Sequence, residues 1–118
     1  MQPVNKEICT AFSNGNFNIA YNFFTDDIEW NIVGDKILNG KNNVVAFCNN
    51  TAAYFTTITT KFTISNLIAD NNCVAIDGTA QFITKENKIT NISSCDVYFF
   101  NDGLVKKITS YCIVTDKK

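Results

Sequence analysis

The fold is decided by residues 93–111, which read SSCDVYFFNDGLVKKITSY. A run rich in β-branched and aromatic residues leads into the turn sequence Asn101-Asp102-Gly103, and a second such run follows. This pattern predicts two long antiparallel strands joined by a tight turn. The first of these strands carries one carboxylate, Asp96, among aromatic residues, so the same stretch also contains a candidate functional group.

The β-rich texture extends over the second half of the chain. Four runs share it, at residues 57–69, 73–84, 89–100 and 104–115. Polar turns of three or four residues separate consecutive runs. Because connections this short join adjacent strands of opposite direction, the four runs are expected to form an antiparallel sheet.

Three segments of helical periodicity come earlier in the chain. The first has an apolar stripe of Val4, Ile8, Ala11 and Phe12, with Pro3 near its start and Asn14-Gly15 at its end. The second and third helices are predicted over residues 17–24 and from about 42 to 55, with a short strand at 28–32 and a loop or small hairpin at 34–40 between them. This order predicts an α+β domain of residues 1–118, in which three N-terminal helices pack on one face of a mainly antiparallel sheet.

Composition excludes several classes of function. The net charge is -1 and all ten basic residues are lysines, so neither a basic field nor arginine side chains would attract nucleic acid. Histidine is absent, which removes Ser-His and Cys-His nucleophiles. The five cysteines contain no C-x-x-C pair, so we expect reduced thiols, with no metal site and no cofactor.

The chain carries no signal for a membrane or for export. No run approaches the roughly 20 apolar residues of a membrane-spanning helix. The segment MQPVNKEICTAF at residues 1–12 lacks the basic-then-apolar pattern of a signal peptide. We therefore expect a cytoplasmic protein that does not bind membranes.

The predicted strand at 89–100 is apolar on both faces. Strand alternation places Ile92, Ser94, Asp96, Tyr98 and Phe100 on one face, and Cys95, Val97 and Phe99 on the other. One face can meet the helices, and no residues remain to cover the second. The predicted partner is therefore a second copy of the chain, in a homodimer packed through the sheet faces.

Five segments follow one another in a familiar order and together span nearly the whole chain. They are AFSNGNF (11–17), FFTDDIEW (23–30), LNGKNNVVAF (38–47), VAIDGTAQF (74–82) and DVYFFNDGLVKKITSY (96–111). In these segments the chain resembles the nuclear transport factor 2-like superfamily and, within it, the SnoaL-like group. It is distantly similar to ketosteroid isomerases.

The resemblance implies a cystatin-like cone, in which helices and a strongly curved sheet enclose a deep pocket, and it implies dimers. The superfamily contains isomerases, hydrolases, cyclases and non-enzymatic binders, so the fold leaves function open. Asp96 stands where the isomerases place the Asp of their oxyanion hole. The positions of their catalytic Tyr and general base fall near Ile8 and Ile32, which are apolar, so that steroid isomerisation by that set of residues is not expected here.

Asp96 and Tyr98 are the candidate catalytic pair. Burial among aromatic rings would raise the pKa of Asp96 and let it act as an acid, and Tyr98 on the same face would donate a hydrogen bond. The competing interpretation of Asp96 is a strand-edge carboxylate bonded to the backbone or to a lysine. The candidate ligand-binding residues are Trp30, Ile32, Phe47, Tyr54, Ile108, Ser110 and Cys112. Core packing is the alternative for the aromatic members, and an inert wall position is the alternative for the cysteine.

Two further polar groups have open roles. Asp26, Asp27 and Glu29 are expected to be solvated residues at the end of a helix rather than a catalytic or metal-binding set. Asp77, Thr79 and Gln81 share one strand face, which is either a polar patch of the pocket or the outer face of the sheet.

Three functions fit these observations. The first is binding of a small apolar or carbonyl-containing molecule in a deep pocket. The second is a cofactor-independent isomerase, cyclase or hydrolase that uses Asp96 as acid or hydrogen-bond donor. The third is a protein–protein adaptor, whose pocket would be filled by its own side chains.

Overall fold

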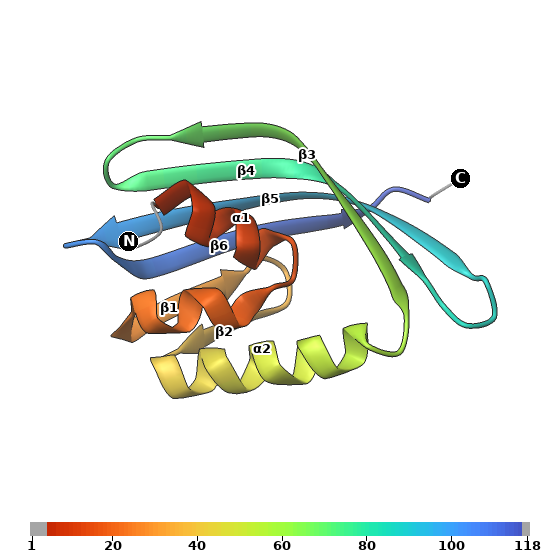
Figure 1. The fold of residues 1–118 in the computed structure, drawn as a ribbon, viewed down its shortest axis with the longest axis horizontal. Helices are drawn as coiled ribbons and strands as arrows, with labels where there is room; N and C mark the ends of the chain where they lie inside the picture. The colour runs from red at the N-terminus through yellow and green to blue at the C-terminus, as the bar shows by residue number, and fades with distance from the viewer. Residues whose placement is uncertain (1–4, 117–118) are drawn as a thin grey trace.

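Residues 5–116, the part of the chain that the computed structural model describes, form three helices and six strands (Figure 1). The helices are α1 (Asn5–Ser13), the 3-10 helix η1 (Phe17–Phe23) and α2 (Lys41–Phe55). The strands are β1 (Phe24–Ile32), β2 (Lys36–Asn39), β3 (Thr59–Ala69), β4 (Cys73–Ile83), β5 (Ile89–Asn101) and β6 (Leu104–Val114). Pro3 and Val4, which the sequence places in the first helix, lie outside the described residues.

The order of elements is the predicted one, with α2 after β1 and β2. The three helices are therefore N-terminal to the four long strands, and only two of them precede the sheet as a whole. The strand predicted from Ile28 begins four residues earlier, at Phe24, so Asp26 and Asp27 belong to a strand and not to a turn. Their carboxylates can remain solvated there because both side chains lie on the exposed part of β1.

The six strands form one mixed sheet in the order β2-β1-β6-β5-β4-β3. The predicted antiparallel pairing of the last four strands is confirmed. The strand β1 adds the one parallel pair of this sheet, because it lies beside β6, and β2 pairs antiparallel with β1 at the edge. The first and last strands of the chain are therefore neighbours in the middle of the sheet.

All three helices lie on one side of the sheet (Figure 1). The core between the two layers is built from buried residues of α1, η1, α2 and the sheet, among them Ile8, Phe12, Ile28, Val44 and Ile108. Within residues 5–116, no helix is long and apolar enough to cross a membrane.

The strands β3 and β4 approach each other unusually closely at Gly78. A Cβ atom at this position would lie 2.1 Å from the carbonyl oxygen of Thr63. The register of β3 shifts next to this point, between Ile64 and Asn66. Glycine is required here by space, because backbone atoms of β3 occupy the volume that any side chain would need.

The second face of the sheet is open to solvent and partly apolar. Ile68 is 69% exposed, Phe99 43%, Tyr111 46% and Ile113 60%. This is the face on which strand alternation places Cys95, Val97 and Phe99, and no helix of the described chain covers it (Figure 1).

Candidate functional site

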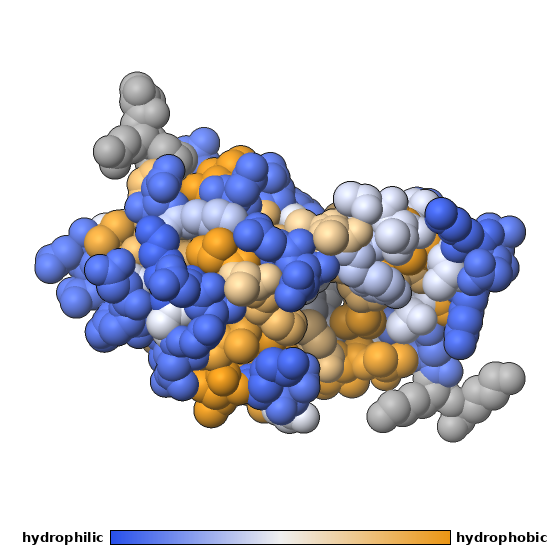
Figure 2. All heavy atoms as spheres, turned by 90° about the horizontal axis from the view of Figure 1, so that it is seen from below, coloured by the Kyte–Doolittle hydropathy of each residue, from blue (hydrophilic) through white to orange (hydrophobic). Residues whose placement is uncertain are grey.

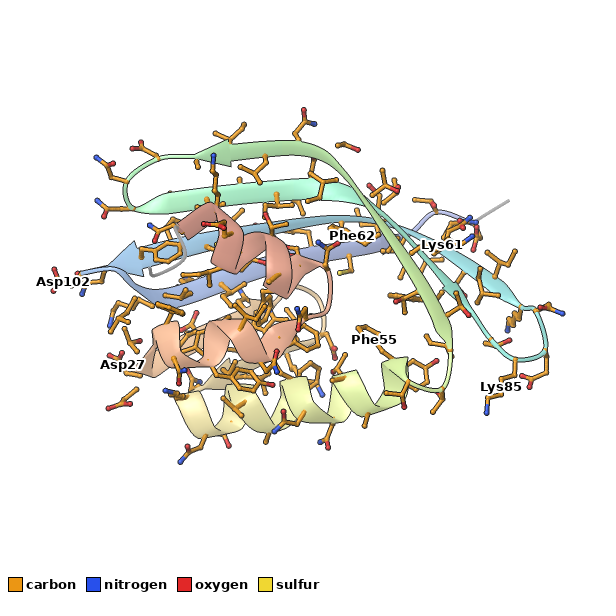
Figure 3. The ribbon with its side chains drawn as sticks, in the orientation of Figure 1. Asp27, Phe55, Lys61, Phe62, Lys85 and Asp102 are labelled. Atoms are coloured by element: carbon orange, nitrogen blue, oxygen red, sulfur yellow. The ribbon has the colours of Figure 1, made fainter. Side chains whose placement is uncertain are left out.

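A cavity of about 500 Å³ lies between the helices and the sheet. Its wall is contributed by the C-terminal end of α1 and the residues after it, by α2, and by the inner faces of β1, β3, β4, β5 and β6. Phe55 of α2 and Phe62 of β3 lie on opposite sides of the space between these elements, with Lys61 next to Phe62 (Figure 3). Figure 2 shows this face of the molecule hollowed near its middle, with apolar side chains around the hollow.

Aromatic rings form a continuous arc along the cavity wall. The arc runs through Phe82, Phe55, Phe17, Phe12, Trp30 and Phe47, and successive ring centroids lie 5.6, 6.3, 4.9, 5.1 and 5.4 Å apart. Such edge-to-face, tilted and stacked contacts hold each ring in a defined orientation. The arc gives the cavity a large and rigid apolar surface.

One cluster of polar side chains interrupts this apolar wall. Ser13, at the end of α1, donates a hydrogen bond of 2.8 Å from Oγ to Oδ2 of Asp96. The same Oγ lies 2.5 Å from the hydroxyl of Tyr98, which also contacts the carbonyl oxygen of Cys9 at 3.3 Å. The helix α1 and the strand β5, more than 80 residues apart, are thus joined at this point.

Ser110 extends the cluster to Trp30. Asp96 and Ser110 lie directly opposite each other on β5 and β6 and are hydrogen-bonded through their side chains. Ser110 Oγ also accepts a hydrogen bond of 2.9 Å from Nε1 of Trp30. The described cavity wall therefore presents a carboxylate surrounded by two serine hydroxyls and a tyrosine hydroxyl.

Burial controls the protonation of this cluster. Removal from water raises the pKa of the Asp96 carboxyl, and the hydrogen bonds from Ser110, Ser13 and Tyr98 oppose this rise. Burial, and next the nearby Asp96, raise the pKa of Tyr98 well above its usual value. An aspartic acid of raised pKa can donate a proton or a hydrogen bond to a ligand, while Tyr98 stays neutral.

Asp96, Trp30, Ile32, Phe47, Ser110 and Cys112 all line the cavity. Cys112 is exposed as a residue, and partial removal of its thiol from water, followed by the nearby Asp96, raises the pKa of that thiol, which favours its protonated, unreactive form. Ile32 occupies the wall as an apolar residue, so this position supplies no general base.

Three other candidates do not line the cavity. Tyr98 is 1% exposed and its hydroxyl is engaged by Ser13, so it supports Asp96 from behind and does not reach a ligand. Ile108 of β6 is fully buried, and in the sheet it lies between its strand partners Trp30 of β1 and Tyr98 of β5. Tyr54 is 55% exposed. It immediately precedes Phe55 in α2, and because a helix turns about 100° per residue, its side chain points away from that of Phe55.

The remaining polar groups lie on the far side of the sheet. Asp77 pairs with Cys95, so it shares the outer face with Thr79 and Gln81, and the last two border a separate polar hollow there. Asp27 pairs with Lys106 at 2.8 Å and Glu29 with Lys107 at 3.5 Å, both on the surface. Within residues 5–116, no three His, Cys, Asp or Glu side chains are grouped as a metal site.

Ser13 is the residue of the cluster that sequence reasoning missed. It follows Cys9 by four residues and Phe12 by one, so it continues the buried stripe of α1. A serine on the buried side of a helix end, just before Asn14-Gly15, is the signal that was available. The individual rings of the arc were also not assigned, although ten phenylalanines indicated an aromatic core or cavity wall.

Comparison with known sequences identifies the family. The sequence profile of the SnoaL-like domain matches residues 6–109. The chain belongs to the SnoaL-like family. No protein with a curated description matches this SnoaL-like chain.

Solved structures support the fold of this SnoaL-like domain. A nuclear transport factor 2-like protein of unknown function from Cytophaga hutchinsonii is 36% identical, with a TM-score of 0.85 over 96% of this chain and 99% of that one. A LEH-like epoxide hydrolase from M. tuberculosis is 17% identical, with a TM-score of 0.68 over 93% and 84% of the two chains. The second likeness concerns the fold alone.

Proposed function

We propose that this SnoaL-like protein binds a small, largely apolar molecule in its cavity, with one polar group of the ligand, such as a carbonyl, directed at Asp96. The observation that carries this proposal is the cavity of about 500 Å³, lined by an arc of rings and one partly buried carboxyl group. This volume falls within the range of roughly 300–1,000 Å³ that is usual for small-molecule sites. The raised pKa of Asp96 widens the pH range over which its carboxyl keeps a proton that it can donate to a carbonyl oxygen.

The adaptor alternative has less support. It requires a cavity filled by the protein's own side chains, whereas this cavity is open.

The binding proposal also includes a cone-shaped fold with a strongly curved sheet, and one functional domain over residues 1–118. The single core cluster supports one domain, and the register shifts within β3 and β5 support a bent sheet. All five cysteines are free, which is in keeping with a reducing compartment such as the cytoplasm.

The binding proposal is tested with aromatic ketones, beginning with acetophenone. Trp30 is the single tryptophan of the chain and lines the cavity, so its fluorescence should change on binding. The variant Ala80→Phe places a ring in the cavity and should abolish the change, while Thr79→Phe, next to it on the outer face of β4, should retain it. Equal responses of both variants, or none in the native protein to any aromatic ketone, would argue against the cavity as a ligand site.

A second candidate, catalysis by Asp96 as a general acid, is favoured by the raised pKa of this residue. It predicts that the protein accelerates exchange of the α-protons of an enolisable ketone in deuterated water, with Asp96 giving its proton to the carbonyl oxygen and a water molecule taking the α-proton, and that Asp96→Asn loses this acceleration. NMR of the ketone methyl group measures the exchange. An unchanged exchange rate on adding native protein would argue against catalysis, and ligand binding would then be the proposed function.

We further propose that the exposed outer face of the sheet joins two copies in a homodimer. This face exposes several large apolar side chains, which a second copy of the chain would cover: Ile68, Phe99, Tyr111 and Ile113.

A further inference from the structure

The hydrogen bonds around Asp96 are oriented toward a negative charge. Trp30 Nε1 can only donate, so Ser110 Oγ accepts from it and has its own proton available for Asp96. Ser13 Oγ also donates to the carboxylate, at Oδ2 of Asp96. Donors that converge on a carboxylate stabilise its ionised form.

No cation balances this carboxylate within the described residues. The ion pairs there involve Asp27 and Glu29 on the surface, and none involves Asp96. Lys61 is the one lysine among the residues that line the cavity in the described chain, and no hydrogen bond or ion pair joins it to Asp96. A partly buried carboxylate with donors arranged around it and no counter-ion among the described residues can pair with a positive charge brought by a ligand.

The aromatic arc suits the same kind of ligand. Trp30 and Phe12 lie 5.1 Å apart beside the polar cluster, since Trp30 donates to Ser110 and Phe12 precedes Ser13. Phe47 extends the ring surface on the far side of Trp30, at 5.4 Å, and Lys36 Nζ already lies over this ring, 5.2 Å from its centroid. Aromatic faces attract organic cations, and the attraction grows when the cation is removed from water.

We propose that the cavity also binds organic ammonium cations with apolar substituents, using Asp96 as the counter-ion and the aromatic arc as the surrounding wall. This inference rests on the proposed function, because it requires the cavity to be a ligand site. It goes further by naming a second and oppositely charged class of ligand. A neutral carbonyl ligand needs Asp96 with its proton, and an ammonium ligand needs Asp96 without it.

The two classes should respond to pH in opposite directions. The titratable groups around Asp96 are Cys9 of α1, Tyr98 of β5 and Cys112 of β6, and Asp35 and Lys61 line the same cavity. The two cysteines and Tyr98 stay neutral at and below pH 8 because burial raises each pKa. Ammonium binding should therefore strengthen as pH rises from 4 to 8, and ketone binding should weaken.

The test compares phenyltrimethylammonium with tert-butylbenzene, which has the same shape and no charge. Trp30 fluorescence and calorimetry give both affinities for the native protein between pH 4 and 8. At pH 8 we expect the ammonium ion to bind about tenfold or more tightly than its neutral isostere. Asp96→Asn should remove this preference, and Asp102→Asn, in the exposed β5–β6 turn, should keep it.

A second variant keeps the test decisive if Asp96→Asn does not fold. Phe47→Leu retains an apolar wall and removes one ring, so it should weaken ammonium binding several-fold and leave tert-butylbenzene binding within about twofold. Equal affinities of the two probes in the native protein, or a preference that survives Asp96→Asn, would overturn the inference. If acetophenone binds and phenyltrimethylammonium does not, the inference alone fails, and if none of the probes binds, the proposed function fails with it.

Discussion

At the scale of the single residue, Asp96 links the chemistry of the cavity to the stability of the protein. Its pKa is raised in the folded state by burial, so the folded protein holds this proton more tightly than the unfolded chain does. Between the two pKa values the folded state binds more protons, and the free energy of unfolding falls as pH rises. Each unit of upward shift corresponds to about 1.4 kcal/mol.

Asp96→Asn should therefore gain stability relative to the native chain as pH rises. Asn keeps an oxygen that accepts from Ser13 and cannot ionise, so the pH-dependent cost of the charge is removed, while the amide nitrogen that replaces the second oxygen adds a cost that does not change with pH. The stability difference should be smallest near pH 3, grow as pH passes through the folded pKa, and then stay constant. Urea unfolding from pH 3 to 8 measures this difference in the free energy of unfolding, with Asp102→Asn as control. A difference that does not change with pH would contradict a raised pKa of Asp96 in the folded protein.

Residue-level prediction succeeded where strand alternation decides the orientation of a side chain. Asp96, Ser110 and Cys112 were assigned to one face because the period of a strand is two. Ser13 could not be found this way, because its contact with Asp96 depends on how α1 lies across β5. Tyr54 was misplaced because a helix turns about 100° per residue, and the choice between neighbours depends on which face meets the sheet.

At the scale of the element, the pair β3–β4 depends on Gly78. Gly78→Ala should destabilise the fold by about 3 kcal/mol or more, because the new methyl group would meet backbone atoms of β3 that cannot move aside as a side chain can. Gly103→Ala is the matched control. It has open space around its Cβ position and a φ of +80°, so we expect a cost of about 1 kcal/mol from backbone strain alone. Denaturant unfolding of both variants distinguishes steric exclusion from strain, and equal costs would count against the close approach at Gly78.

Element-level prediction was most successful for the four long strands. Their β-branched texture and short turns determine both existence and pairing, and each boundary falls within a few residues. The second helix was predicted as an α-helix and is a 3-10 helix of seven residues, a length at which both helix types can present the same apolar side chains. The β1–β6 pairing was not predictable, because no turn connects these strands and their neighbourhood depends on the whole sheet.

At the scale of the whole molecule, the outer sheet face should determine the oligomeric state. Phe99→Glu places a charge in the proposed dimer interface and should convert the protein to a monomer of 13.2 kDa. Ile19→Glu removes an apolar side chain of η1 with nearly the same exposure, 44% against 43%, and should leave the dimer intact. Sedimentation or light scattering gives the mass directly, and a native protein that is monomeric at high concentration would refute the proposed dimer.

The adjacency of β1 and β6 also has a consequence for how the chain is made. Trp30 and Ser110 are 80 positions apart, and Ser13 and Asp96 are 83 apart, so contacts essential to the cavity join the two ends of the chain. A nascent chain on the ribosome cannot complete the sheet until β6 has emerged, and closing such distant contacts makes folding slow. Until β6 emerges, the apolar faces of the early helices and of β1 stay uncovered, and this is the period of greatest exposure to aggregation or chaperone capture.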